Sequence, residues 1–181
     1  MEVLAMNPPR ISRTVPEINN IKDNMSRAFM HSLNSTVNYH LEESSRAFDN
    51  LGIDLRAFNL PQGKSRQLIS EENEIRLQMK GVSVTSSSKF SEDENSITYN
   101  LSENLIAIGT HYLIVVVMPA DKEIDTWRDI DEESVRLWAR AYYVLIDGQL
   151  TKGKITIPKS NILNPDTYAG LFEAAKNKDA L

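Results

Sequence analysis

The chain contains no cysteine, and this absence excludes disulfide bonds, thiol catalysis and thiolate metal sites. Glycine is also scarce, with seven residues among 181, whereas loops that cradle phosphates or cofactors commonly use more of it. No uninterrupted apolar run approaches the roughly 18 to 20 residues that cross a bilayer, because the longest, YLIVVVM at 112–118, has the length of a strand. The first thirty residues lack the apolar segment of a secretory signal, so we expect a product that is cytoplasmic at synthesis and makes no contact with a membrane.

A basic excess is missing as well. The net charge of −5 argues against a protein that binds nucleic acid by neutralising phosphates, although a local basic patch stays compatible with it. What is present is the composition of a globular domain, with 41% hydrophobic and 25% charged residues. A chain of this length is most simply one domain, and it can bury a core without a metal or a disulfide.

The N-terminal part of the sequence predicts an arm followed by a helix. Residues 1–13 contain two prolines and no sustained period, which indicates an extended arm, either disordered or docked on a neighbour. Thr14 and Glu17 have the spacing of a capping box, and an apolar stripe at helical spacing runs from there to about Asn50. A single helix of that length would leave part of its stripe uncovered, which indicates self-association. Poor helix formers at 34–38 keep a second interpretation open, in which two shorter helices fold on the domain's own sheet. The stripe residues are Ile18, Ile21, Met25, Phe29, Leu33, Val37, Leu41 and Phe48.

The hydrophobic period changes to two in the middle of the chain. Apolar and polar residues alternate at 74–80 and again at 97–101, as in strands with one buried face, and Gly81 is expected to mark a bulge. The continuous apolar run at 111–118 predicts a strand that is covered on both faces. Three or four strands are therefore expected in this region.

Three polar segments separate these elements. Residues 52–73 are expected to form a connection, and the serine-rich residues 83–95 to form a mobile hairpin tip or flap. The third segment, 121–131, is acidic and lacks the spacing and central glycine of a calcium loop, so we interpret it as solvated surface.

Helical signals return near the C-terminus. Asp131 precedes a segment in which Val135, Trp138, Tyr142 and Leu145 share a helical face, and Gly148 stands where a left-handed C-terminal cap belongs. Asn164 is expected to cap a terminal helix. The predicted fold is an α+β single domain over 14–181, with a long N-terminal helix or helix pair, a central mostly antiparallel sheet of four or five strands, and two C-terminal helices.

The stretch GQLTKGKI at 148–155 has the glycine and lysine spacing of a phosphate-binding loop. Such a loop needs a following helix and a Ser or Thr that reaches Mg²⁺, but Ile155 occupies the hydroxyl position and ITIP at 155–158 favours an extended chain. We therefore interpret the stretch as a solvated turn that carries Lys152 and Lys154.

The histidines do not form a recognisable metal pair. His31 and His40 are nine residues apart, and His111 has no acid or second histidine near it in the sequence, so a surface or half-buried position is expected for it. Trp127 and Trp138 are expected in the core or at an interface. No residue is assigned a catalytic, metal-binding or cofactor-binding role.

From about residue 111 onward the segments follow one another in a characteristic order. HYLIVVVMP is followed by an acidic link, then by RLWARAYYVLIDGQLTKGK, a short ITIP and ILNPDTYAGLFEAAKNK. This part resembles the C-terminal part of neck, or head-completion, proteins of contractile-tailed bacteriophages. The sequence departs from the family's pattern in having Asp147 before the glycine and Lys159 after the proline. The matching residues are Tyr142 or Tyr143, Gly148, Lys152 or Lys154, Pro158, Leu163, Asn164 and Ala174.

The resemblance implies a non-enzymatic, ring-forming virion protein at the head-tail junction. Its partners would be further copies of itself and other virion proteins such as portal or tail components, with DNA passing through a lumen without specific binding. It would be located in the virion, and in the host cytoplasm during assembly. A matrix or coat protein of another virus, or a nucleotide-binding protein that uses Lys154, are the alternatives. The residues expected to form packing or interface surfaces are Phe29, Leu33, Val37, Leu41, Trp138 and Tyr142.

Overall fold

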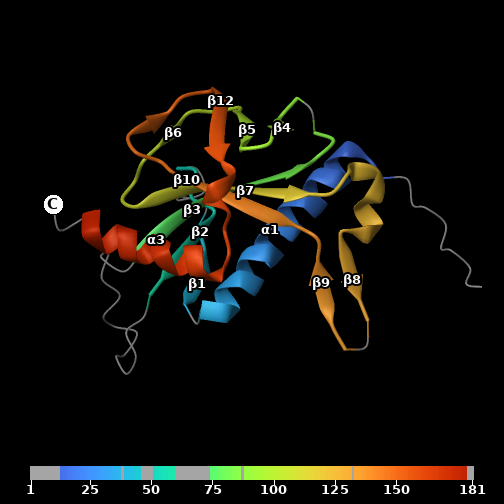
Figure 1. Ribbon diagram of the computed structural model, residues 1–181, viewed down its shortest axis with the longest axis horizontal. Coiled ribbons are helices and arrows are strands. Elements are labelled where there is room, and N and C mark those ends of the chain that lie inside the picture. Colours follow the sequence, from blue (N-terminus) through green and yellow to red (C-terminus); the bar gives the residue numbers. More distant parts are fainter. Residues whose placement is uncertain are drawn as a thin grey trace, which may run out of the picture.

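The computed structural model describes residues 13–37, 39–45, 51–59, 74–86, 88–131 and 133–178 (Figure 1). Within these ranges the helices are α1 (Val15–Val37) and α3 (Pro165–Lys178), with two short 3-10 turns, η3 (Asp121–Thr126) and η4 (Lys159–Asn161). The strands are β1 (His40–Glu43), β2 (Leu55–Phe58), β3 (Glu74–Ser83), β4 (Phe90–Glu92), β5 (Ser96–Leu101), β6 (Leu105–Ile106), β7 (His111–Met118), β8 (Arg128–Ile130), β9 (Val135–Leu137), β10 (Arg140–Leu145), β11 (Gln149–Leu150) and β12 (Gly153–Pro158). The α+β class predicted from the sequence is confirmed.

A five-stranded sheet in the order β1-β2-β3-β7-β10 forms the middle layer. All its pairs are antiparallel except β3 with β7, which run parallel, so the prediction of a mostly antiparallel sheet of this size is correct. All eight residues of β7 are buried, as predicted for the apolar run at 111–118. Successive side chains of a strand point to opposite faces, so β7 contributes to a core on each side of the sheet.

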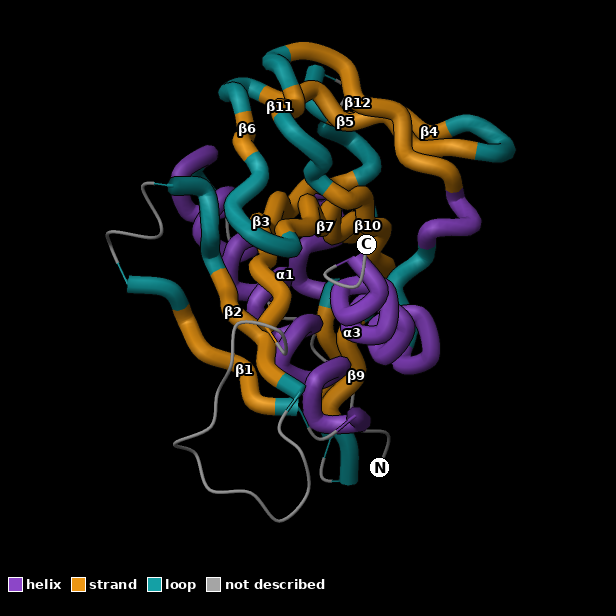
Figure 2. The backbone as a smooth tube through the Cα atoms, turned by 90° about the vertical axis from the view of Figure 1, so that its left-hand side faces the viewer, coloured by secondary structure: helices purple, strands orange, loops and turns teal. Residues whose placement is uncertain are grey.

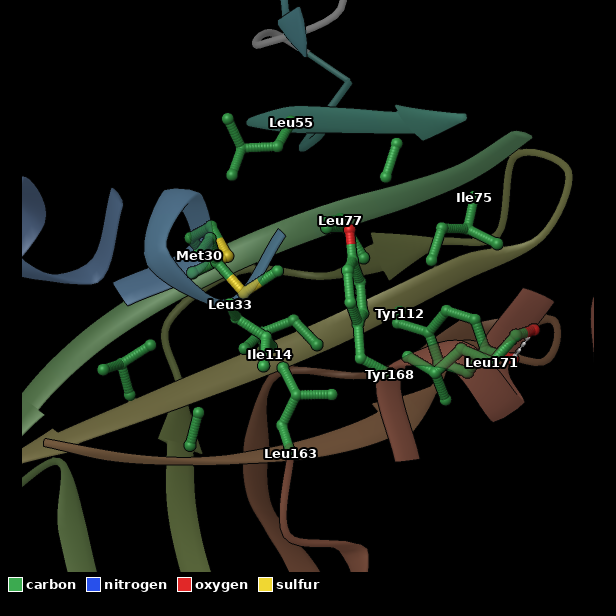
Figure 3. Packing of buried hydrophobic residues seen from close by; sticks show 14 of the residues in the cluster. Met30, Leu33, Leu55, Ile75, Leu77, Tyr112, Ile114, Leu163, Tyr168 and Leu171 are labelled. Atoms are coloured by element: carbon green, nitrogen blue, oxygen red, sulfur yellow. Dashed lines mark hydrogen bonds between the residues drawn. The ribbon is translucent and has the colours of Figure 1, made fainter. Parts of the chain in front are cut away.

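The two helices cover one face of this sheet. Figure 2 shows α1 and α3 below the central strands, and Figure 3 shows the side chains that fill the space between them. This helix-side core includes Met30 and Leu33 of α1, Leu77 and Ile114 of the sheet, and Tyr168 of α3.

Helix α1 begins where the capping box predicted. The Glu17 carboxylate accepts hydrogen bonds from the backbone N–H of Thr14 at 2.7 Å and from its hydroxyl at 2.8 Å. The helix runs over β3 at Gly81, where a Cβ atom would lie 2.8 Å from the Lys22 carbonyl oxygen. The pairing of β3 with β7 is continuous through Gly81, so the predicted bulge is wrong and the glycine instead permits close approach of the helix.

The predicted extension of this helix to Asn50 is wrong. The helix ends at Val37 and the chain turns into β1, so the break expected near residues 34–38 occurs, but a strand follows it instead of a second helix. The Asn34 side chain donates to the Tyr39 carbonyl at 2.6 Å, which supports this turn. The apolar stripe of the shortened helix is covered by the domain's own sheet, and the inference of self-association from an excess stripe is lost with it.

A three-stranded sheet in the order β12-β5-β4 covers the other face of the central sheet. Figure 2 shows it above β3, β7 and β10. Within 83–95, the segment predicted to form a flap, residues 90–92 pair with β5 as strand β4, and Phe90 is buried. Leu113, Val115 and Val117 of β7 complete this far-side core.

The predicted helix after Asp131 is wrong, because that segment forms β9 and β10. Among residues 133–178 there is a single α-helix, α3, instead of the two that the sequence predicted. Alternate residues of β10 are packed in the two cores, with Tyr143 on the helix side and Tyr142 on the far side, so two-sided burial produced a pattern that resembles a helical stripe. The cap of α3 is as predicted, since Asn164 Oδ1 accepts from the Thr167 N–H at 2.9 Å.

The predicted connection at 52–73 contains strand β2 at its start, and its remainder from residue 60 lies outside the described residues. The predicted arm lies outside them too, except for Arg13. None of the described helices is long and apolar enough to span a bilayer.

Candidate functional site

The most distinctive surface of the molecule is a two-stranded ribbon, defined here as residues 128–131 and 133–138. Strands β8 and β9 pair only with each other, and Figure 1 shows them extending away from the domain at its lower right. An isolated two-stranded ribbon gains little stability from its own hydrogen bonds and is at best marginal in water. The ribbon therefore depends on how its two ends are held.

The root of the ribbon is anchored by a tryptophan. Trp127 is fully buried, and its indole N–H donates to the Ala120 carbonyl at 3.1 Å. The Trp127 carbonyl in turn accepts from the backbone N–H of Trp138 at 2.8 Å, which joins the two strands where they leave the domain. The prediction that Trp127 lies in the core or at an interface is confirmed for the core.

The tip of the ribbon is a hydrogen-bonded turn built on Asp131. Its carboxylate accepts from the N–H groups of Glu133 at 2.8 Å and Ser134 at 2.6 Å, and from the Ser134 hydroxyl at 3.0 Å. These hydrogen bonds, of which that from the Glu133 backbone is the strongest influence, hold the pKa of Asp131 below its ordinary value. An acidic residue that resembled a helix cap in the sequence is therefore a turn cap in the structure.

Between these ends the ribbon exposes large apolar side chains. Ile130 and Val135 are directly opposite each other in the pairing, and Trp138 follows β9. Each of the three is more than half exposed. Single exposed apolar residues are common on protein surfaces, but an adjacent pair with a third on the other side of the same projecting element is typical of an interaction site.

Hollows flank the ribbon on both sides of its root. A groove of about 360 Å³ separates it from α1 and is lined by Ile21 and Met25 of the helix and by Val135 and Leu137 of the ribbon. A second hollow of about 320 Å³ is lined in part by Val84, Pro119 and Trp138. The apolar surface of the ribbon thus continues into the body of the domain.

The stretch that resembles a phosphate loop is a turn between strands. Gly148 precedes β11 and residues 153–158 form β12, so the prediction that ITIP is extended is confirmed. Gly148 has a left-handed φ of 79°, but it follows a strand and caps no helix, which corrects the expected C-terminal cap. Both lysines are exposed, but only Lys152 lies in the predicted turn, because Lys154 belongs to β12 and pairs with Asn100.

The three histidines lie on different elements, α1, β1 and β7. His31 is exposed on α1, and His40 Nε2 lies 2.9 Å from a Glu42 carboxylate oxygen. His111 is completely buried, so the surface or half-buried position expected for it is wrong. Burial lowers the pKa of His111, and neither of its ring nitrogens has a hydrogen-bond partner among the described residues. Among the described residues no group of three His, Cys, Asp or Glu side chains has the arrangement of a metal site.

Buried charges tie neighbouring secondary-structure elements together. Lys22 of α1 is buried, and its ammonium lies 2.9 Å from Asp121 Oδ1 and 3.1 Å from the Ser86 hydroxyl. On the other side of the sheet Glu74 is buried and accepts from Arg56 at 2.8 Å and from Arg76 at 2.9 Å. Burial acts to raise the pKa of Glu74, but the hydrogen bonds from the two guanidinium groups outweigh it and leave the pKa below its ordinary value.

Five of the six residues expected to form packing or interface surfaces pack within the chain. Leu33 and Tyr142 are buried, and Phe29, Val37 and Leu41 are partly buried against the helix-side core. The sixth residue, Trp138, is the one that the structure places on the exposed ribbon. The sequence does not indicate Ile130 and Val135 as exposed residues, because the helical pattern places Val135 on a shared helical face with Trp138.

Comparison of the chain with protein-family models, with curated proteins and with solved structures finds no match.

Proposed function

We propose that this protein is a non-enzymatic structural subunit that assembles with copies of itself into a ring, in the head-tail neck or tail junction of a tailed phage. The observation that carries the proposal is the exposure of three large apolar side chains on the projecting ribbon, with the pair Ile130 and Val135 beside the groove next to α1 and Trp138 beside the other hollow. The ribbon has marginal stability by itself, and it would be stabilised if a neighbouring subunit covered its exposed apolar side chains.

The chemistry of the rest of the molecule is compatible with this role. The buried charged groups Glu74 and Lys22 are paired and tie secondary-structure elements together. A ring whose subunits carry a net charge of −5 would also bind passing DNA weakly, because affinity for DNA comes from neutralising its phosphates. The resemblance of residues 111 onward to phage neck proteins supports the choice of the head-tail junction, with portal or tail proteins as further partners.

The proposal is tested by measuring the mass of the purified full chain by native mass spectrometry over a range of concentrations, followed by electron microscopy. We expect a closed oligomer of identical subunits. Val135→Asp should dissociate it, because a charge would replace one of the covered apolar side chains. A chain that stays monomeric up to high micromolar concentration would contradict the proposal.

The matched control is Val15→Asp. Val15 is an equally exposed apolar residue, but it is the first residue of α1 and lies outside the ribbon. An aspartate there is favourable at the positive end of the helix, so this variant should assemble like the parent chain. Equal loss of assembly in both variants would show that the ribbon has no special role.

A further inference from the structure

Three lysines gather at the end of the molecule opposite the ribbon. Lys89, Lys152 and Lys154, named the lysine patch here, are exposed, and in the described part of the chain none of them has an ion-pair partner. Lys154 is paired with Asn100 across β12 and β5, and the Asn100 N–H donates to the Lys89 carbonyl at 2.8 Å. The patch therefore lies on neighbouring strands of one sheet.

An exposed apolar residue lies beside this patch. Strand β11, which leads into the turn of Lys152, pairs with β6 so that Gln149 is opposite Ile106. Ile106 is more than half exposed. The backbone N–H of Lys152 donates to Asn104 Oδ1 at 2.8 Å, which fixes the turn against the β6 segment. The surface thus combines positive charge with an uncovered apolar side chain.

The ribbon carries the complementary combination. At its tip the exposed acidic residues Asp131 and Glu133 flank the apolar pair Ile130 and Val135, whereas Asp129 is opposite the exposed Arg136 in the pairing. Asp129 and Glu133 form no ion pair with any described residue. Opposite charges that flank apolar residues on two surfaces are what electrostatic complementarity between partners requires.

We propose that the acidic end of the ribbon of one copy docks on the lysine patch and Ile106 of the next copy. The inference rests on the proposed function and names the two surfaces that meet in the ring. Figures 1 and 2 show β9 and β12 at opposite ends of the molecule, so one copy does not satisfy its own patch. Contact between two different surfaces is heterologous, and it gives a ring when the rotation between successive copies closes.

The proposal also accounts for the resemblance of GQLTKGK to a phosphate-binding loop. Lys152 in the turn and Lys154 at the start of β12 have the charge to hold an anion, but a strand follows them where phosphate loops have a helix. On this proposal the anion is the carboxylate of a neighbouring subunit.

Exchange of the two charges tests the contact. Glu133→Lys and Lys154→Glu should each weaken assembly of the full chain by at least about tenfold, because each places like charges against each other. A chain with both substitutions restores opposite charges and should assemble like the parent, and so should an equimolar mixture of the two single variants. The mixture gives a clear result even if the double variant folds poorly. Because the contact joins opposite charges, assembly of the parent chain should also weaken as salt is added.

Cross-linking provides a second measurement, since the chain has no cysteine of its own. Glu133→Cys with Lys154→Cys in one chain should give, after oxidation, a ladder of covalent multimers on a non-reducing gel. Glu133→Cys with Asp166→Cys, whose second cysteine is on exposed α3, is the matched control and should give no ladder beyond the dimer.

Failure of the contact and failure of the proposed function give different results. Rings of the parent chain that are unaffected by either charge reversal and form no ladder would overturn the contact alone. The contact alone would also be overturned if Lys152→Glu and Lys154→Glu abolished binding of ATP or double-stranded DNA while assembly was unchanged. A monomeric parent chain would overturn both proposals.

Discussion

Replacement of Gly81 by alanine tests how closely α1 is held against the central sheet. The added Cβ would lie 2.7 Å from the Ser26 hydroxyl and 2.8 Å from the Lys22 carbonyl oxygen. The hydroxyl can rotate away, although it would lose its 2.8 Å hydrogen bond to that carbonyl. The carbonyl belongs to the helix backbone, so relief of the second contact requires that α1 itself move.

Overpacking of this kind costs about 1–3 kcal/mol. The loss of a glycine offsets part of it, because alanine lowers the entropy of the unfolded chain by an equivalent of about 0.4–1 kcal/mol. We therefore expect Gly81→Ala to lower the free energy of unfolding by about 1–2 kcal/mol. For a domain of this size the melting temperature should fall by roughly 2–8 °C.

Gly170→Ala is the matched control for this substitution. Gly170 lies in α3, and a Cβ there would meet nothing within 4 Å. Alanine is the better helix former, so this variant should be more stable by about 0.5–1 kcal/mol. Thermal and urea unfolding of both variants measure the two effects. If Gly81→Ala were as stable as the parent or more so, the close approach of α1 to β3 described above would be refuted.

Three further substitutions follow from the hydrogen-bonded groups. Glu74→Gln should lower the free energy of unfolding by about 2–3 kcal/mol at pH 7, because two partly buried guanidinium groups lose their carboxylate. Folding lowers the pKa of Glu74, so its contribution to the free energy of unfolding is present above the unfolded pKa of about 4.3 and is lost as the pH falls through the folded pKa. The urea midpoints of the variant and the parent should therefore converge in acid. A difference that persisted at pH 2 would contradict this. Asn164→Ala removes the cap of α3 and should lower the free energy of unfolding by about 1 kcal/mol. The control Asn24→Ala, on an exposed part of α1, should change it very little. Equal melting temperatures of the two variants would count against the cap. Tyr168→Phe removes the hydroxyl that donates to Asn34 at 3.2 Å between the two helices and should cost about 1 kcal/mol in chemical unfolding, an unchanged midpoint being the contrary result.

The sequence predicted correctly those elements that can be recognised from nearby residues without knowledge of their tertiary neighbours. The caps at Thr14 and Asn164 use side chains three residues away, so they are readable from spacing alone. The strand at 111–118 was found because a short β-branched run between Gly109 and Pro119 has few alternatives.

Tertiary pairing decided the elements that the sequence misassigned. Residues 140–145 are strand because they pair with β7, and no local pattern records that partner. Leu41 continues the helical spacing of apolar residues, yet it lies in a strand because it pairs with Ala57 of β2. The site was missed for a related reason: the apolar residues of the ribbon resemble core residues until the structure shows that nothing in the described part of the chain covers them.

The alternation of β7 side chains between the two cores has a consequence for how the molecule opens. Neither the helices nor the small sheet can detach without exposing one face of the same strand, so the layers share their unfolding free energy. Amide protons of β7 should then exchange with solvent only through complete unfolding of the chain, whereas those of the ribbon exchange through local fluctuations. Mechanical force applied at the ribbon would meet its greatest resistance at this central strand.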